Sequence, residues 1–349
     1  MKKDLTIVYM GTPDFAVEPL KSLISGGFNV VAVVTVADKP AGRGLKLHES
    51  PVKQFVIQHN LNVADKKVTA YQQPDEKTKP TSAVVEQSQG IIKILQPVKL
   101  SEPDFINELR ELNADLFIVV AFRKLPQVVW QMAPLGCCNL HASLLPQYRG
   151  AAPINHAVIN GETITGVTTF FIDEQIDTGN IILQKQVPIG PDETAGEVHD
   201  KLMETGAGLV VETVKAIQEG GYVAKSQSAE GSLTQHKVAP KIFRDDCRID
   251  WHKPAFEVHN KIRGLSPFPG AFSVLVSNES EKEVKIHRTH KTALKSDLLP
   301  GEIMQEKNKL FVMCHDEMLE IISLQLPGKK MMQTEEFLRG NRTVLIKFK

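Results

Sequence analysis

Apolar and polar positions in the first part of the chain follow two alternating patterns. Short, nearly continuous apolar runs, typical of strands buried on both faces, occupy residues 5–10, 30–36 and 114–122. Segments with a helical spacing of apolar residues lie between these runs, at 16–27, 51–60 and 103–113. This alternation predicts an α/β domain with a Rossmann-like, mostly parallel sheet that is covered by helices on both faces.

The pattern changes after residue 155. Runs at 166–173 and 181–189 predict two strands whose connecting loop carries several acids, and a helix is predicted over 193–219. From residue 270 onward, short apolar runs alternate with turn-forming polar residues, which is typical of a small OB-like β-barrel.

These elements predict two domains in a chain of 349 residues. The first would span 1–222, a polar linker would cover 223–236, and the barrel would span 237–349. The stretch from about 64 to 93 is rich in Gln, Lys, Thr, Ser and Pro, and it is predicted to be a surface insertion in the first domain.

Composition adds a hint about partners. The chain is 42% hydrophobic and 23% charged, as expected for a globular protein, and its net charge is zero. Divided at 236/237, the 41 basic and 41 acidic residues fall unevenly: 20 basic and 15 acidic residues lie in the C-terminal part, and 21 and 26 lie before it. A basic barrel behind an acidic body suggests polyanion binding, although a chance scatter of solvated charges explains it equally well.

Other features restrict the location and the chemistry. No apolar span of 18 residues occurs and no signal peptide is recognisable, so we expect a cytoplasmic protein without a membrane partner. The four cysteines form no CxxC pair and have no metal-ligand spacing with histidine. A structural metal is therefore not expected.

The candidate chemistry comes from three polar residues that follow predicted strands: Asn139, His141 and Asp177. An amide donor, a histidine that can carry a proton near neutral pH and a carboxylate suit a reaction that passes through a tetrahedral oxyanion. Acyl transfer fits this set best if a second substrate supplies the nucleophile, because the stretch NLHASLLPQYRG offers no convincing one.

Each residue also has a structural interpretation. His141 can be a hydrogen-bonded loop histidine, Asn139 a turn cap, and Asp177 a turn acid before Thr-Gly. Serine hydrolysis is not favoured, because no GxSxG motif surrounds Ser143. The motif GTPDF at 11–15 lacks the spacing of a dinucleotide fingerprint, so Gly11 is predicted only to allow a tight turn.

Two longer stretches change this balance. NLHASLLPQYRGAAPI at 139–154 and GVTTFFIDEQIDTGNII at 166–182 resemble the signature of the folate-dependent formyltransferases. The loop DKPAGRGLKL at 38–47, together with GTPDF and RGAAPI, resembles the members of that superfamily that act on methionyl-tRNA. Further similarity at RIDW, KIRGLSPFPGAF and LQLPGKK extends the resemblance over nearly the whole chain.

The resemblance implies a function and a site. The donor would be 10-formyltetrahydrofolate, the acceptor would be the α-amine of initiator methionyl-tRNA, and the catalytic trio would be Asn139, His141 and Asp177. The segment SLLP, formed by Ser143, Leu144, Leu145 and Pro146, would bind the pterin. Arg43 and Lys46 of the 38–47 loop would contact the tRNA acceptor end, and Lys329 and Lys330 would add phosphate contacts. The resemblance also implies a monomer.

The sequence departs from the family pattern at two places. The family usually joins LPV directly to QP, whereas LNV at 61–63 and LQPVKL at 95–100 are here separated by the insertion. An aromatic-Gly step common in the family is replaced by AFRKLP at 121–126, near the expected pterin pocket. Three other functions stay open at this point. The first is a binding protein with an RNA-binding barrel and a first domain that senses folate or a nucleotide without turnover. The others are an aminosugar formyltransferase and a hydrolase that releases formate.

Overall fold

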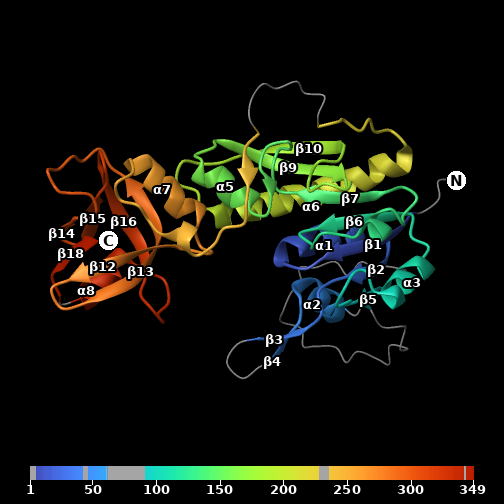
Figure 1. Ribbon diagram of the computed structural model, residues 1–349, viewed down its shortest axis with the longest axis horizontal. Coiled ribbons are helices and arrows are strands. Elements are labelled where there is room, and N and C mark those ends of the chain that lie inside the picture. The colour runs from blue at the N-terminus through green and yellow to red at the C-terminus, as the bar shows by residue number, and fades with distance from the viewer. Residues whose placement is uncertain (1–4, 42–45, 60, 62–90, 228–235, 342) are drawn as a thin grey trace, which may run out of the picture. The chain divides into compact units, whose positions relative to one another are not determined.

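The computed structural model describes residues 5–41, 46–59, 61, 91–227, 236–341 and 343–349 (Figure 1). Of the stretch 64–93, which was predicted to be an insertion, only residues 91–93 are therefore described. Contacts divide the chain into two compact units. Unit 1 comprises Met1–His141, Val167–Lys185 and Met203–Ser232, and unit 2 comprises Ala142–Gly166, Gln186–Leu202 and Leu233–Lys349.

A seven-stranded sheet passes through unit 1. Its order is β10-β9-β7-β6-β1-β2-β5. The strands are β1 (Thr6–Gly11), β2 (Asn29–Val34), β5 (Lys93–Leu95), β6 (Leu116–Val120), β7 (Cys137–His141), β9 (Ile164–Phe171) and β10 (Ile181–Pro188). The strands from β5 to β7 pair in parallel, and β7 pairs with β9 antiparallel. The predicted mostly parallel sheet is confirmed.

Apolar side chains cover both faces of this sheet. On one face Val8, Phe117 and Val119 pack with Phe105 and Leu109, which lie in the helix Pro103–Glu111. The intervening residues of β1 point the other way and are also fully buried. The described helices are α1 (Val17–Ser25), α2 (Pro51–Gln58), α3 (Pro103–Glu111), α4 (Gln127–Trp130), α5 (Pro153–Ile159), α6 (Ala195–Glu219), α7 (Ala255–Gly264) and α8 (Thr334–Gly340). Burial on both faces explains why these strands read as continuous apolar runs.

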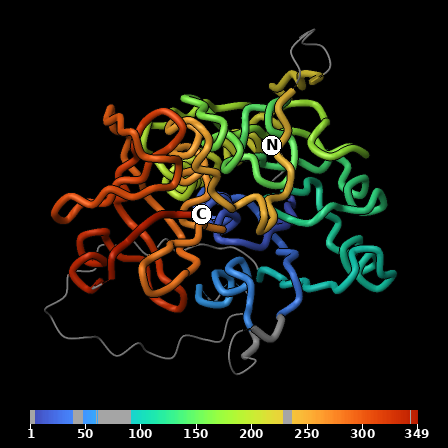
Figure 2. The backbone as a smooth tube through the Cα atoms, turned by 60° about the vertical axis from the view of Figure 1, so that its left-hand side comes forward, coloured from blue at the N-terminus to red at the C-terminus, as the bar shows by residue number. Residues whose placement is uncertain are grey.

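A nearly closed antiparallel barrel forms most of unit 2, and its strands are the orange and red tube in Figure 2. The sheet order is β14-β15-β16-β13-β12-β18, and β17 pairs with β16. The strands are β12 (Ala271–Ser277), β13 (Glu281–Lys291), β14 (Ile303–Glu306), β15 (Lys309–Met313), β16 (Met318–Gln325), β17 (Met332–Gln333) and β18 (Leu345–Phe348). A bridge between Glu302 and Lys347 joins the two ends of the sheet. The predicted barrel is confirmed.

Unit 2 also contains elements that the apolar pattern did not indicate. Helix α7 packs Val258 and Ile262 into the barrel core, and α8 adds Phe337 and Leu338. Two short parallel strands, β8 (Arg149–Gly150) and β11 (Val238–Ala239), join the segment after SLLP to the start of the barrel region. The remaining described strands belong to unit 1 and form the antiparallel pair β3 (Lys39–Ala41) and β4 (Lys46–His48).

Candidate active site

Strand β7 carries two of the three candidate catalytic side chains. Asn139 lies opposite Phe170 of β9, and His141 lies opposite Thr168. Residues two apart on a strand point to the same face, about 6.6 Å apart along the chain, so both polar groups share one face of the sheet. His141 is the last residue of β7, and the parallel strands β1 and β6 end at the same edge.

The third candidate, Asp177, reaches His141 from the loop between β9 and β10. The His141 Nδ1 and Asp177 Oδ2 atoms are 3.7 Å apart, and the two side chains are 7% and 12% exposed. At this distance a protonated imidazole forms an ion pair with the carboxylate, and partial burial strengthens it relative to a surface pair. The structure thus brings together two of the residues that the sequence predicted to act together.

The Asp177 loop has a defined conformation. The Asp173 carboxylate accepts hydrogen bonds from the backbone N–H of Gln175, at 3.1 Å, and from the Thr178 hydroxyl, at 2.7 Å. Asp177 itself adopts φ +57°, a left-handed conformation that asparagine and aspartate tolerate better than most residues. A Cβ atom at Gly179 would lie 1.7 Å from the Phe171 carbonyl oxygen, so the loop closes against β9 only with glycine there.

Sequence reasoning missed one buried residue of this site, Gln227. Its side-chain amide Nε2 donates to the Asp177 carbonyl at 3.1 Å and to the Gly179 carbonyl at 2.7 Å. Gln227 belongs to the polar stretch that was predicted to be a linker, and no periodicity marks it. A side-chain contact over about fifty residues of sequence leaves no local signal.

The loop after β1 lies at the same sheet edge as His141. Gly11 is the last residue of β1, and a Cβ atom there would be 2.7 Å from the Ala16 Cβ atom, so close packing requires glycine at this position. The neighbouring Thr12 hydroxyl is buried without a hydrogen-bond partner among the described residues. The edge therefore presents a polar group in addition to those of β7.

These groups define what the site can do chemically. A carboxamide N–H and a protonated imidazole are hydrogen-bond donors, which suits them to the oxygen of a carbonyl carbon under attack. A carboxylate beside the imidazole can hold the proton there and exchange it. The arrangement is suited to acyl transfer between two bound substrates.

The predicted pterin segment follows β7 directly in the chain and belongs to unit 2. Ser143 is fully buried, and its hydroxyl donates to the Gln147 carbonyl at 2.6 Å. Leu145 is buried, whereas Leu144 and Pro146 are half-buried. Within unit 2, Ser143 and Leu145 thus shape the segment, while Leu144 and Pro146 keep part of their apolar surface accessible.

A polar network fixes the residues that follow this segment. The buried Tyr148, at φ +59°, donates its hydroxyl hydrogen bond to Glu162, and the Lys237 ammonium pairs with the same carboxylate. Burial, together with the Glu162 contact, raises the pKa of Tyr148 well above its ordinary value. Burial alone would raise the pKa of Glu162, but the Lys237 and Tyr148 contacts outweigh it and keep that pKa low.

Three of the four residues that were predicted to contact tRNA lie within the described part of the chain. Arg43 lies outside the described residues, and Lys46 begins β4. Lys329 and Lys330 are exposed on the loop before β17. Lys329 also lines a cavity of about 400 Å³ whose wall includes Lys282 and Phe337.

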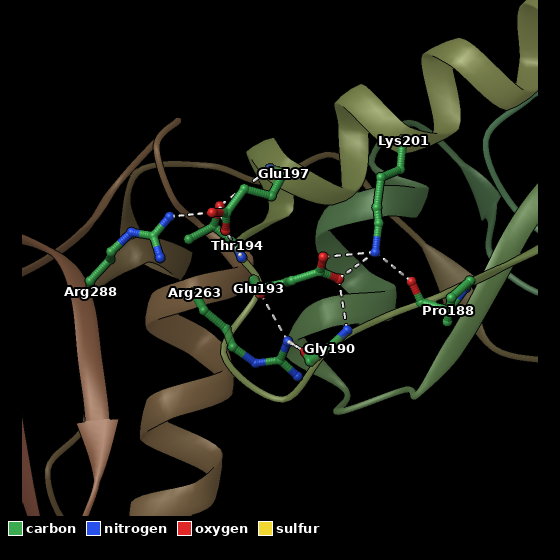
Figure 3. Close-up of polar contacts among 8 residues, drawn as sticks. All are labelled: Pro188, Gly190, Glu193, Thr194, Glu197, Lys201, Arg263 and Arg288. Carbon is green, nitrogen blue, oxygen red and sulfur yellow. Dashed lines mark hydrogen bonds and ion pairs between the residues drawn. The ribbon is translucent and has the colours of Figure 1, made fainter.

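Part of the positive charge of unit 2 is used internally, as Figure 3 shows. Arg263 of α7 donates to the Gly190 and Glu193 carbonyls, at 3.2 and 2.9 Å. Arg288 of β13 pairs with Glu197, whose carboxylate also accepts from the Thr194 amide at the start of α6. These arginines connect the barrel side of unit 2 to the beginning of α6, so they count less toward polyanion binding.

The described part of the chain contains neither a cluster of metal ligands nor a membrane-spanning helix. The four cysteines are buried thiols, and across the described ranges no group of three or more histidine, cysteine or acidic side chains is arranged to hold a metal ion. Within the same ranges, no helix has both the length and the apolar character needed to cross a bilayer.

Two family profiles match the chain. The profile described as "Formyl transferase" matches residues 4–214, and the one described as "Formyl transferase, C-terminal domain" matches residues 241–342. The first match includes the candidate catalytic residues, and the second covers most of the barrel.

Curated relatives align over nearly the full length. A methionyl-tRNA formyltransferase of Bacteroides fragilis is 50% identical over 341 residues, covering 97% of this chain and 96% of the relative. A methionyl-tRNA formyltransferase of Flavobacterium johnsoniae is 43% identical over 336 residues, covering 96% of each. Sequence identity at this level over nearly the whole chain shows membership of the same family, and not only a common fold.

Solved structures show the same architecture at much lower identity. An N-formyltransferase from Helicobacter canadensis, in complex with folinic acid and dTDP-3-aminofucose, has a TM-score of 0.60 at 19% identity and covers 91% of this chain and 98% of its own. HypX from Aquifex aeolicus, in complex with tetrahydrofolic acid, has a TM-score of 0.58 at 17% identity, covering 99% of this chain and 51% of its own. These likenesses establish the fold alone. The profile matches and the nearly full-length relatives together show that the chain belongs to the methionyl-tRNA formyltransferases, within the formyl transferase family.

Proposed function

We propose that this protein transfers a formyl group from 10-formyltetrahydrofolate to the free α-amine of initiator methionyl-tRNA. The products are N-formylmethionyl-tRNA, for translation initiation, and tetrahydrofolate. The observation that carries the proposal is the approach of Asp177 to His141 at 3.7 Å, beside Asn139 on the same face of the sheet. Family membership supports the choice of donor and acceptor.

The chemical step follows from the three side chains. The neutral α-amine attacks the formyl carbon, a C–N bond forms, and the carbonyl π electrons move to the oxygen. The Asn139 amide and the protonated His141 imidazole stabilise that oxyanion by hydrogen bonding, each by about 3 kcal/mol. Asp177 holds the proton on His141 and assists the transfer of the amine proton to N10 of the folate. The bond from the formyl carbon to N10 then breaks, and tetrahydrofolate leaves.

We propose that the pterin lies against the SLLP segment. Leu144 and Pro146 keep accessible apolar surface that suits a flat ring, and backbone groups of the segment supply hydrogen bonds. The buried Ser143 and Leu145 hold this surface in shape. No metal is needed for the proposed step.

The acceptor RNA requires cationic contacts. We assign Arg43 and Lys46 to the acceptor end, and Lys329 and Lys330 to phosphates along the stem. Lysines that bind phosphates displace the counterions condensed on the RNA, so the apparent tRNA affinity should fall steeply as the salt concentration rises. Replacing Lys329 and Lys330 with Ala should reduce the slope of log affinity against log salt by about 1 to 2 while leaving folate affinity unchanged. A slope equal to that of the unaltered protein would remove these two residues from the interface.

We also propose that the protein works as a monomer in the cytoplasm, where charged tRNA and folates are found. Full-length similarity to translation enzymes supports this location.

One acceptor assay tests the proposal. The purified protein is incubated with 10-formyltetrahydrofolate and either charged initiator tRNA, a nucleotide-linked aminosugar, or no acceptor. N-formylmethionine should appear after the aminoacyl ester is hydrolysed, and only in the tRNA reaction. Formylation of the sugar amine instead would reassign the acceptor, and formate release without any acceptor would indicate a hydrolase. Binding of folate without any product would support a sensor.

A further inference from the structure

Gln227 is a buried polar residue whose side chain is committed to the Asp177 loop. It is 4% exposed, and its Nε2 group donates to two carbonyl oxygens, those of Asp177 and Gly179, at 3.1 and 2.7 Å. A primary amide has two N–H bonds, so a single side chain can satisfy both acceptors at once. A glutamate or methionine of similar size has no donor for either one.

The backbone around Gln227 is fixed to the same unit. Lys225 forms a two-hydrogen-bond bridge with Ile181 of β10, with both N···O distances at 2.8 Å. The ring of Tyr222 packs on Phe171 of β9, with 5.7 Å between the ring centroids. The residues before Gln227 are therefore attached to the two strands that flank the Asp177 loop.

The loop has a specific need for such a contact. Asp177 has a left-handed backbone, and residues in that region are maintained by surrounding contacts that over-determine the conformation. Asp173 holds the first half of the loop through Gln175 and Thr178. Gln227 holds the second half at the carbonyl of Asp177 itself, and a small change of φ or ψ there would rotate the carboxylate away from His141.

We propose that Gln227 is a positioning residue for the formyl transfer: its side-chain amide fixes the Asp177 backbone so that the carboxylate faces the His141 imidazole. The inference rests on the proposed catalytic role of Asp177. It assigns a role in the reaction to the polar stretch after α6, which the sequence indicated only as a connection between domains.

The test uses variants that remove the donors and keep the size of the side chain. Gln227→Met and Gln227→Glu each remove both N–H groups, and Gln131→Glu makes the same charge change at an exposed site of the same unit. The single-turnover rate of formyl transfer should fall on the order of 10- to 100-fold in both Gln227 variants, because small misplacements of a catalytic group have effects of that size. Affinities for folate and tRNA, and the rate of Gln131→Glu, should stay within about 2-fold of the unaltered protein.

A double-mutant cycle separates positioning from a general structural role. In an Asp177→Asn background, Gln227→Met should cause no further loss of rate, because its effect passes through the Asp177 carboxylate. Multiplication of the two losses, or an unchanged rate in the single Gln227→Met variant, would overturn the inference. Where Gln227→Met does not give folded protein by thermal melting, Gln227→Asn replaces it, since this variant keeps the amide but shortens its reach.

The same cycle distinguishes the two proposals. An unchanged rate in Asp177→Asn overturns the catalytic assignment, and the inference about Gln227 falls with it. A slow Asp177→Asn combined with a normal Gln227→Met overturns only the positioning role.

Discussion

At the residue scale, the proposed chemistry depends on the position of one carboxylate, that of Asp177. Asp177 occupies a backbone conformation that costs about 1 to 3 kcal/mol for a residue other than glycine. Hydrogen bonds from the Gln227 amide and the close packing of Gly179 on Phe171 offset this cost. A residue keeps such a conformation when the contacts around it over-determine its backbone.

Replacing Asp177 with Asn should lower the rate of formyl transfer by about 10² to 10⁴, because it removes the carboxylate that we propose exchanges a proton with His141. Glu174→Gln makes the same change at an exposed acid of the same loop, and it should leave the rate unaltered. Single-turnover assays of both variants check this, with substrate affinities measured in parallel. Equal rates in the two variants would mean that Asp177 has no role in the step.

Single residues differ in how far the sequence reveals them. The approach of Asp177 to His141 agrees with the expectation that the candidate residues lie close together. The reason differs from the expected one, because Asn139 and His141 lie within β7 and the Asp177 loop follows β9, which runs antiparallel to β7. Gln227 was not predictable, because its partners are backbone carbonyls that exist only after the Asp177 loop has formed.

At the element scale, the packing of α6 on β7 helps to place the two candidate catalytic side chains of β7. Leu140 stands between Asn139 and His141 on β7 and points to the opposite face of the sheet. Its side chain meets α6 at Gly206, where a Cβ atom would lie only 2.8 Å from the Leu140 Cδ2 atom. Glycine at this point lets the helix approach the strand closely.

Two glycines of α6 provide a matched pair of predictions. A Cβ atom at Gly208 would meet nothing within 4 Å, so Gly208→Ala should raise the free energy of unfolding by about 0.5 to 1 kcal/mol through helix propensity. Gly206→Ala makes the same change two residues away, but it should forfeit that gain because the new methyl group presses on Leu140. Urea unfolding of both variants measures the difference. Equal stabilisation by the two substitutions would contradict the close packing of α6 on β7.

Elements with a regular apolar pattern were predictable, and those with buried polar residues were not. Helix α6 was predicted over 193–219 and spans Ala195–Glu219, because its apolar residues repeat with helical spacing. Helix α7 was missed because its buried face includes His259 and Arg263 beside Val258 and Ile262, which breaks the apolar repeat. Both buried polar residues have hydrogen-bond partners from distant parts of the chain: Thr289 and Pro191 for His259, and Gly190 and Glu193 for Arg263.

At the scale of the whole molecule, the lowered pKa values of buried histidines make the stability of the fold depend on pH. Burial, helped by the nearby Arg263 charge, holds the pKa of His259 below its ordinary value of 6.5 despite the Pro191 and Asp192 contacts. Burial likewise lowers the pKa of His287. Unit 2 therefore contains two buried histidines, His259 and His287, whose surroundings favour the neutral imidazole.

These shifts predict how stability depends on pH. Below about pH 6.5 the unfolded chain protonates His259 while the folded protein keeps it neutral, so the unfolded state binds more protons. The contribution of His259 is complete above pH 6.5 and decreases as the pH falls from there toward the lower folded pKa. His259→Gln should flatten this part of the profile, whereas His252→Gln, at an exposed position, should not. Urea unfolding between about pH 8 and pH 5 measures both, and parallel profiles for the two variants would contradict the assignment.

The central claim is that His141, held beside Asp177 and Asn139 at the edge of the sheet, stabilises the oxyanion during formyl transfer. The most direct measurement is the single-turnover rate of His141→Ala with saturating 10-formyltetrahydrofolate and methionyl-tRNA. We predict a fall of about 10² to 10⁴ with nearly unchanged affinities for both substrates. A rate equal to that of the unaltered protein would contradict the account.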